Sequence, residues 1–227
     1  GRSFRFRQDF MADYRLGVNE TDNLLLATAV TASSAFPPIF SPVEITTNPN
    51  AWHDQKWGDD ADMLARLRGK IVLADGGIYD NMGLESLNES IRLVSDAGAP
   101  FSIDESLRND YFSQLGRVRD ILIDQTRGLR KRQLIDDFML QRQRGAYWGI
   151  DTAIDDYAVG GKLAVDSVTT GKLESMPTRL ARVDPDQQGR LINWAYALAD
   201  AALRAPQRAN LSVSPALALP RPEFPLQ

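Results

Sequence analysis

Residues 71–83 read IVLADGGIYDNMG, and this stretch decides the class of fold that the sequence predicts. It begins as a short β-branched run, typical of a buried strand, and continues with an acid and two glycines where that strand ends. A second run of the same kind, IRLVS, follows at 91–95. The residues between them, NMGLESLNES (81–90), are interpreted as a crossover helix. Strands that alternate with helices in this way predict an α/β fold with a largely parallel sheet.

Further elements are expected on both sides of this segment. They are a strand near the N-terminus, a helix within 19–36 capped by Asn19 or Thr21, strands at 42–46 and 145–150, and helices at 62–69, from Ser106, and from Asp184 to about Arg204. The helix from Ser106 carries an apolar stripe at helical spacing, which predicts a face packed on the body of the protein. The stripe is Leu107, Tyr111, Leu115, Val118, Leu122 and Leu129. We expect one domain over residues 1–205 and a proline-rich, surface-hugging or loose tail over 206–227.

The composition of the chain excludes several classes of partner. Its 227 residues carry a net charge of −4, which argues against nucleic acid, because phosphate binding needs a basic surface. Cysteine is absent, so neither a disulfide framework nor a thiolate metal site is expected. No apolar run is long enough for a membrane span, and the first residues do not resemble a signal peptide. The sequence therefore predicts a soluble or peripheral membrane protein and leaves its compartment open.

Asp75 is the main candidate for chemistry. Catalytic groups gather at the carboxyl ends of parallel strands, and Asp75 stands at such an end. Gly76 and Gly77 are expected to turn the backbone with positive φ and to leave room for a substrate or nucleophile. In the alternative interpretation, Asp75 makes an Asx turn or caps a helix. The residues alone favour neither reading.

Other polar candidates have simpler structural interpretations. His53, the single histidine, is read as a solvated loop residue. Ser33, Ser34 and Ser86 are near the acid in sequence, but none lies between glycines in a strained strand-to-helix turn. The acidic residues Asp59, Asp60 and Asp62 are interpreted as the start of a helix, because no metal-ligand spacing fits them.

Two surface features are candidates for contact with lipid. Trp52 and Trp57, with Phe36 and Phe40, would form either an interfacial patch or the packing of a loop, and packing is favoured. The basic run RGLRKRQ at 127–133 is interpreted as a solvated helix face in preference to a patch that binds an anionic membrane.

Three segments together resemble the second half of a bacterial patatin-like phospholipase domain. They are LLLATAVTASSAFPPIFSPVEI (24–45), VLADGGIYDNMGLESL (72–87) and IRLVSDAGAPF (91–101), and the resemblance covers most of residues 1–205. It implies a three-layer α/β/α domain with a largely parallel central sheet, and hydrolysis of lipid carboxyl esters without a metal or cofactor. By this resemblance Asp75 is the acid of a Ser-Asp dyad, Gly76 and Gly77 are the glycines of its D-G-G motif, and Asn81 is the asparagine that follows.

The chain departs from the family's pattern in one respect. It contains no G-x-S-x-G motif and no glycine-rich oxyanion loop. We therefore expect a partial domain whose serine lies upstream of Gly1. The expected partners are a lipid ester, the missing N-terminal part of the same domain, and a membrane surface. The alternative is a non-catalytic patatin-like scaffold or a domain that binds lipid or protein.

Overall fold

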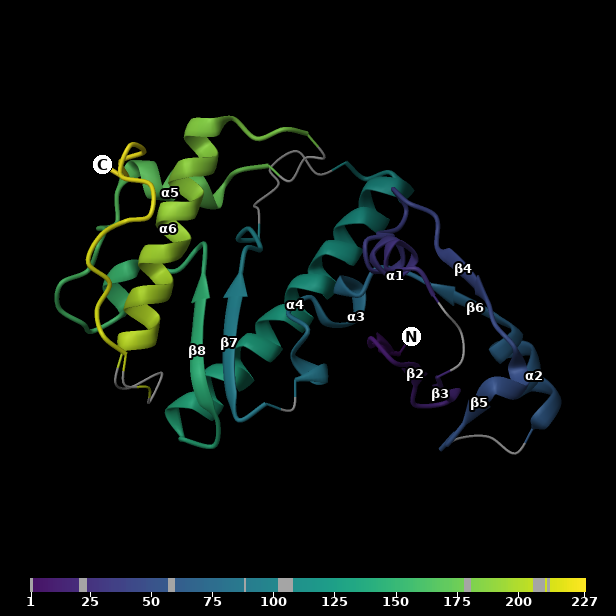
Figure 1. Ribbon diagram of the computed structural model, residues 1–227. Helices are drawn as coiled ribbons and strands as arrows, with labels where there is room; N and C mark the ends of the chain where they lie inside the picture. The colour runs from purple at the N-terminus through teal and green to yellow at the C-terminus, as the bar shows by residue number, and fades with distance from the viewer. Residues whose placement is uncertain are drawn as a thin grey trace. The chain divides into compact units, whose positions relative to one another are not determined.

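The computed structural model describes residues 2–20, 24–56, 60–87, 89–101, 108–177, 181–205, 211 and 213–227. The chain forms two compact units, Gly1–Leu87 and Asn88–Gln227, whose secondary structure Figure 1 shows. The predicted single domain over 1–205 stays a prediction.

The first unit is built from two small antiparallel sheets. One has the order β1 (Phe4–Phe6), β2 (Met11–Asp13), β3 (Gly17–Asn19) and β5 (Trp52–His53), and the other pairs β4 (Val43–Thr46) with β6 (Lys70–Leu73). Their buried side chains share one apolar cluster, made by Met11, Ile45, Trp52 and Ile71. The helical elements are α1 (Leu26–Ser33), η1 (Pro49–Ala51), α2 (Ala61–Gly69), α3 (Gly77–Asp80) and η2 (Leu84–Ser86).

Two sequence expectations in this unit are wrong. The crossover helix over 81–90 is replaced by the four-residue α3 and the short η2, because Gly83 takes a left-handed conformation (φ 65°) between them. Helix α1 has Leu25 at its N-cap and no side-chain cap, since Asn19 belongs to β3 and is buried there. Thr21 lies outside the described residues.

The second unit contains a strand–helix–strand arrangement. Strand β7 (Ile91–Asp96) and strand β8 (Arg144–Gly149) pair in parallel, joined through the 29-residue α4 (Tyr111–Met139). Helices α5 (Val168–Glu174) and α6 (Pro185–Arg204) and the short η3 (Ile154–Asp156) complete it. The predicted start of α6 is confirmed, with Asp184 as the cap and Pro185 in the first turn.

The described part of the C-terminal tail lies against α6. The buried Asn193 side chain donates to the carbonyls of Arg221 and Phe224 and accepts from the amide of Arg221. Leu226 joins the main apolar cluster of this unit. The surface-hugging form of the predicted tail is thus the one that these residues adopt.

A largely parallel central sheet is not what the structure shows. Among the described residues β7–β8 is the only parallel pair, and the other strand pairs are antiparallel. Parallel neighbours need a crossover connection, and α4 is the only element here that provides one. The tight turn from β2 to β3, held by Asp13 Oδ1 accepting from the amides of Arg15 and Leu16, produces an antiparallel pair instead. Over the residues that the structure describes, the fold is mixed α/β with three small sheets.

An ion pair is buried where β7 ends. The Asp96 carboxylate accepts from Arg127 Nε at 2.8 Å and from the Tyr147 hydroxyl at 3.0 Å. The side chains of Arg127 and Asp96 are only 11% and 2% exposed. Burial, followed by the charge and the hydrogen bond of Asp96, raises the pKa of the Tyr147 hydroxyl. This cluster ties α4 to both strands of the sheet.

The apolar stripe predicted to pack α4 is mostly exposed. Tyr111, Leu115, Val118, Leu122 and Leu129 are all at least half exposed, whereas Leu134 and Phe138 are the buried residues of the helix. Leu107 lies outside the described residues. Within the part of the chain that the structure describes, none of the helices is long and apolar enough to span a bilayer.

Candidate active site

Asp75 follows β6 by two residues and is fixed by its backbone. Its amide donates to the carbonyl of Ala35, just beyond the end of α1, at 3.0 Å. Its carbonyl accepts from the amide of Ile78 at 3.3 Å, in the first turn of the short helix α3. The end of α1 and the start of α3 therefore hold this residue between them.

The carboxylate of Asp75 is oriented through one of its two oxygens. Oδ1 accepts from the backbone amide of Gly77 at 2.6 Å, which is the bond of an Asx turn. Among the described residues, Oδ2 has no hydrogen-bond partner. The side chain is half-buried. One oxygen thus holds the turn, and the other can accept a proton.

Of the two glycines of the motif, only Gly77 is required by its surroundings. The expectation of positive φ is wrong: Gly76 is right-handed (φ −63°, ψ −27°), and Gly77 is not among the glycines with positive φ. A Cβ at Gly77 would lie 2.8 Å from Asp75 Oδ1 and 2.9 Å from Asn81 Oδ1. Gly77 is therefore needed for close approach, and it separates the acid from Asn81.

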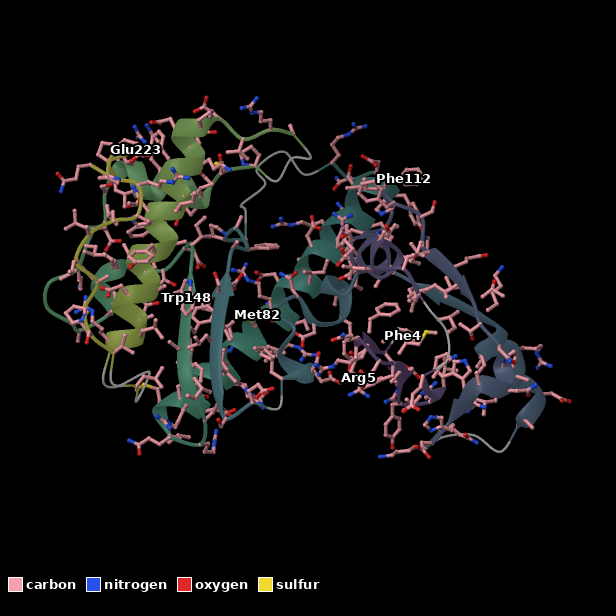
Figure 2. The ribbon with its side chains drawn as sticks, in the orientation of Figure 1. Phe4, Arg5, Met82, Phe112, Trp148 and Glu223 are labelled. Atoms are coloured by element: carbon pink, nitrogen blue, oxygen red, sulfur yellow. The ribbon has the colours of Figure 1, made fainter. Side chains whose placement is uncertain are left out.

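Asp75 lines a cavity of about 1030 Å³ that lies within the first unit. Gly76, Gly77 and Asn81 line it too, so all four predicted site residues share this cavity. Its apolar wall comes from β1, the end of β6 and the segment around α3. The apolar lining residues include Phe4, Phe6, Leu16, Leu73, Ile78 and Met82, of which Figure 2 labels Phe4 and Met82. An acid beside an apolar hollow suits a substrate with one reactive polar group and a long apolar part.

Three basic residues of the cavity were not predicted from the sequence. Arg2, Arg15 and Lys70 all line it. Lys70 also contacts Glu44 at 2.9 Å. They lie in three separate segments, and no local pattern marks them, so only the fold brings them to the same cavity.

The three serines that are near the acid in sequence do not lie in the structural setting of a nucleophile. Ser33 and Ser86 line the cavity, and a Cβ at Gly76 would lie 3.9 Å from Ser33 Oγ. Ser33 ends α1, and Ser86 belongs to the short η2. Ser34, next in the chain, is exposed. None follows a strand directly, so none has the geometry of a nucleophile elbow.

The remaining sequence candidates lie away from the cavity. His53 is exposed and contacts Asp54 at 2.9 Å and Glu20 at 3.8 Å. Asp60 caps α2 by accepting from the amide of Met63, and Asp62 stands in its first turn, as expected for a helix start. Asp59 lies outside the described residues, and among those described no group of side chains could hold a metal ion.

The loop tryptophan Trp52 confirms the packing interpretation. It is 5% exposed, and its Nε1 donates to Thr47 Oγ1 at 2.9 Å. Phe36 is half-buried and Phe40 is exposed, while Trp57 lies outside the described residues. Trp52 therefore belongs to the core of the first unit and offers no surface to lipid.

Comparison with known proteins gives one match. Residues 2–88 match the family model described as Patatin-like phospholipase. Curated proteins and solved structures gave no significant match. The matched segment contains the whole of the cavity around Asp75. It supports the family resemblance within residues 2–88, and with it a lipid hydrolase as the family-level function, whereas the segment 91–101 lies outside the match.

Proposed function

We propose that this chain supplies the general base of a serine acyl hydrolase that cleaves carboxyl esters of lipids. The observation that carries the proposal is the Asp75 carboxylate on the wall of a cavity of about 1030 Å³, inside the segment that matches the Patatin-like phospholipase family model. Its Oδ1 is held by the amide of Gly77, and its Oδ2 is directed to no other group of the described chain.

Each step of the reaction gives Asp75 one proton to accept or return. Oδ2 takes the proton of a serine hydroxyl while the serine oxygen attacks the ester carbonyl. The same oxygen returns that proton to the leaving alcohol as the tetrahedral intermediate collapses to an acyl-serine. Water then attacks the acyl group and gives its proton to Asp75, which passes it to the departing serine. The serine of this proposal lies upstream of Gly1.

The cavity walls divide the substrate between them. The acyl chain takes the apolar wall that includes Phe4 and Met82, where its burial from water is favourable. The basic residues among those that line the cavity, Arg2, Arg15 and Lys70, are the candidates to meet an anionic head group through charge-assisted hydrogen bonds.

The substitution Asp75→Asn in the complete protein tests this function. Asparagine keeps the shape of the side chain and can still accept from the amide of Gly77, but it cannot accept the serine proton. General-base assistance is worth about 10²–10⁴-fold, so we expect kcat on a lipid ester to fall at least that much. Circular dichroism controls for the fold. A folded variant that keeps more than about a tenth of the wild-type rate would show that Asp75 is only a turn residue.

A serine within the chain is tested separately. If the nucleophile lies upstream, the 227-residue chain alone should neither hydrolyse a short nitrophenyl ester nor react with a fluorophosphonate probe. Turnover together with a label on Ser33, Ser34 or Ser86 would place the dyad within this chain. Ser33 is the serine to examine first, because it lines the cavity beside Gly76.

A non-catalytic binding domain is the second candidate, and one observation favours it. The bond from the amide of Gly77 to Asp75 Oδ1 already gives a structural reason for an aspartate at this position. In that case Asp75→Asn changes neither stability nor lipid binding. A G-x-S-x-G sequence before Gly1 in the complete protein would favour the enzyme, and its absence would favour the binding domain.

A further inference from the structure

The N-terminal two thirds of α4 present an exposed apolar surface. The exposed fraction of its apolar side chains runs from 41% at Ile121 to 81% at Phe112. The surface consists of Tyr111, Phe112, Leu115, Val118, Ile121, Leu122 and Leu129 and is called the α4 stripe below. Tyr111 and Phe112 contact each other edge to face at the start of the helix, where Figure 2 labels Phe112.

The stripe points away from the sheet that α4 covers. At about 100° per residue, Tyr111, Leu122 and Leu129 fall within about 20° of one another around the helix axis. Arg127, Leu134 and Phe138 fall on the opposite side, about 140–180° away. Those three are the residues through which the helix meets β7 and packs in the unit. The apolar stripe is therefore not the face that holds α4 in its unit.

Basic side chains flank the stripe on both sides. Between Tyr111 and Arg132 the helix has six basic and two acidic residues, whereas the whole chain carries a net charge of −4. Arg127 and Lys131 turn towards the sheet, where they meet Asp96 and the ring of Tyr147. The other four basic residues, which lie nearer the stripe, are Arg117, Arg119, Arg130 and Arg132. Arg117 also covers the ring of Phe101, and Arg119 also pairs with Asp120.

We propose that the α4 stripe docks on the surface of a bilayer that contains anionic lipid. An apolar helix face with aromatic residues, bordered by arginines, is the arrangement that lies in a membrane interface. Long arginine side chains can keep their charge among the head groups while their stems cover the apolar boundary. The stretch of α4 from Tyr111 to Arg132 is basic although the chain as a whole is acidic, and a basic border suits a surface of anionic lipid.

A second copy of the chain fits the same surface less well. A twofold dimer would place the stripe against itself and bring the flanking arginines of the two helices close together. Like charges brought together in this way oppose association. An anionic lipid surface faces the same arginines with the opposite charge. The charge pattern therefore favours an anionic bilayer over a second copy of the chain.

The test measures binding and does not depend on the proposed hydrolysis. The full chain is floated with vesicles of phosphatidylcholine alone and with vesicles that contain about 30% phosphatidylglycerol. We expect binding to the anionic vesicles, much weaker binding to the neutral ones, and weakening by added salt, which screens exposed charges. Leu115→Ser with Leu122→Ser should lower the partition coefficient at least about tenfold, because two apolar side chains no longer enter the interface.

Two variants separate the stripe from general stickiness. Val165→Ser with Leu217→Ser removes two apolar side chains that are 52% and 98% exposed outside α4, and it should leave binding unchanged. Arg130→Gln with Arg132→Gln should weaken binding to anionic vesicles about tenfold or more and leave the neutral background unchanged. Circular dichroism checks that each variant folds.

Three results would overturn the proposal. The first is absence of binding to the anionic vesicles. The second is an equal loss of binding in the two paired serine variants, which would mean that α4 is not the contact. In the third, the chain does not bind vesicles but sediments as a dimer, and Leu115→Ser with Leu122→Ser converts that dimer to a monomer. This result would assign the stripe to a contact between copies.

Discussion

Gly77→Ala is the substitution that most directly tests how the site is built. The added methyl group would lie 2.8 Å from Asp75 Oδ1 and 2.9 Å from Asn81 Oδ1, whereas ordinary contacts of a Cβ begin near 3.4 Å. The carboxylate must therefore retreat by about half an ångström, away from the Gly77 amide that it accepts from at 2.6 Å. Gly76→Ala is the matched control, because its new Cβ would come no closer than 3.9 Å to Ser33 Oγ in a backbone conformation that alanine adopts freely.

The loss of stability expected in Gly77→Ala follows from the hydrogen bond that it weakens, from the Gly77 amide to Asp75 Oδ1. A hydrogen bond to a charged group is worth about 1.5–3 kcal/mol, and the loss of glycine's freedom in the unfolded chain returns about 0.4–1 kcal/mol. Because Asp75 is only half-buried, we expect Gly77→Ala to lower the free energy of unfolding by about 1–2 kcal/mol. At about 2–4 °C per kcal/mol for a chain of this size, Tm falls by about 2–8 °C. Gly76→Ala should leave Tm unchanged or raise it slightly.

The assay compares Tm and hydrolysis for the two glycine variants in the complete protein. A catalytic group misplaced by about 1 Å can cost about 10²-fold in rate, so a displacement of half that size should lower kcat about tenfold in Gly77→Ala. KM should change little, since the cavity walls stay in place. If Gly77→Ala melts and hydrolyses like Gly76→Ala, then the contact between Gly77 and the Asp75 carboxylate does not position the acid, and the reasoning fails.

Two further outcomes concern the cluster at the end of β7. Arg127→Met should lower the free energy of unfolding by about 3–5 kcal/mol in urea titrations, because it strands the Asp96 carboxylate, which is 2% exposed. Arg119→Ala breaks an exposed pair with Asp120, in which the two side chains are 40% and 49% exposed, and should lower the free energy of unfolding by less than about 1 kcal/mol. Equal losses in Arg127→Met and Arg119→Ala would contradict the view that the buried pair is the stabilising one. The pKa of Tyr147 is raised above its ordinary value of 10.0, so the folded state keeps the phenol proton to higher pH than the unfolded chain does. The contribution of Tyr147 to the free energy of unfolding is thus present below about pH 10 and declines above it, by up to about 1.4 kcal/mol per pH unit relative to Tyr147→Phe. A difference in stability between the two proteins that stays constant from about pH 9 to 11 would refute this.

Local signals predicted the elements of this protein better than their pairing. The start of α6 was predicted from Asp184, Pro185 and Asp186, because a cap, a proline in the first turn and an acid act within a few residues of each other. Strands β4, β6, β7 and β8 were likewise expected from short β-branched or aromatic runs. Strand direction is not local, and β6 pairs antiparallel with β4, although its composition is equally that of a parallel strand.

The site shows the same division between local and distant causes. Asp75, Gly76, Gly77 and Asn81 lie within seven residues of one another, and the structure places them all on one cavity. The positive φ expected of both glycines is wrong: a close approach requires glycine at Gly77, and neither a close approach nor a left-handed turn requires it at Gly76. Arg2 and Arg15 reach the cavity only through the packing of β1 and β2, which no spacing in the sequence predicts.

The stripe of α4 shows why periodicity alone does not tell what an apolar face meets. Its 3.6-residue repeat predicted a helix and a buried face, and the helix is confirmed. The face that packs is instead set by Leu134 and Phe138 and by the buried pair of Arg127 with Asp96, on the other side of the helix. An exposed repeat of leucine and aromatic residues this long costs solubility, so its presence calls for a partner. If Asp75 acts on esters of lipids, a membrane surface is both the partner of the α4 stripe and the source of the substrate. The vesicle test on α4 examines membrane docking, and the substitution at Asp75 examines hydrolysis, so each proposal can fail without the other.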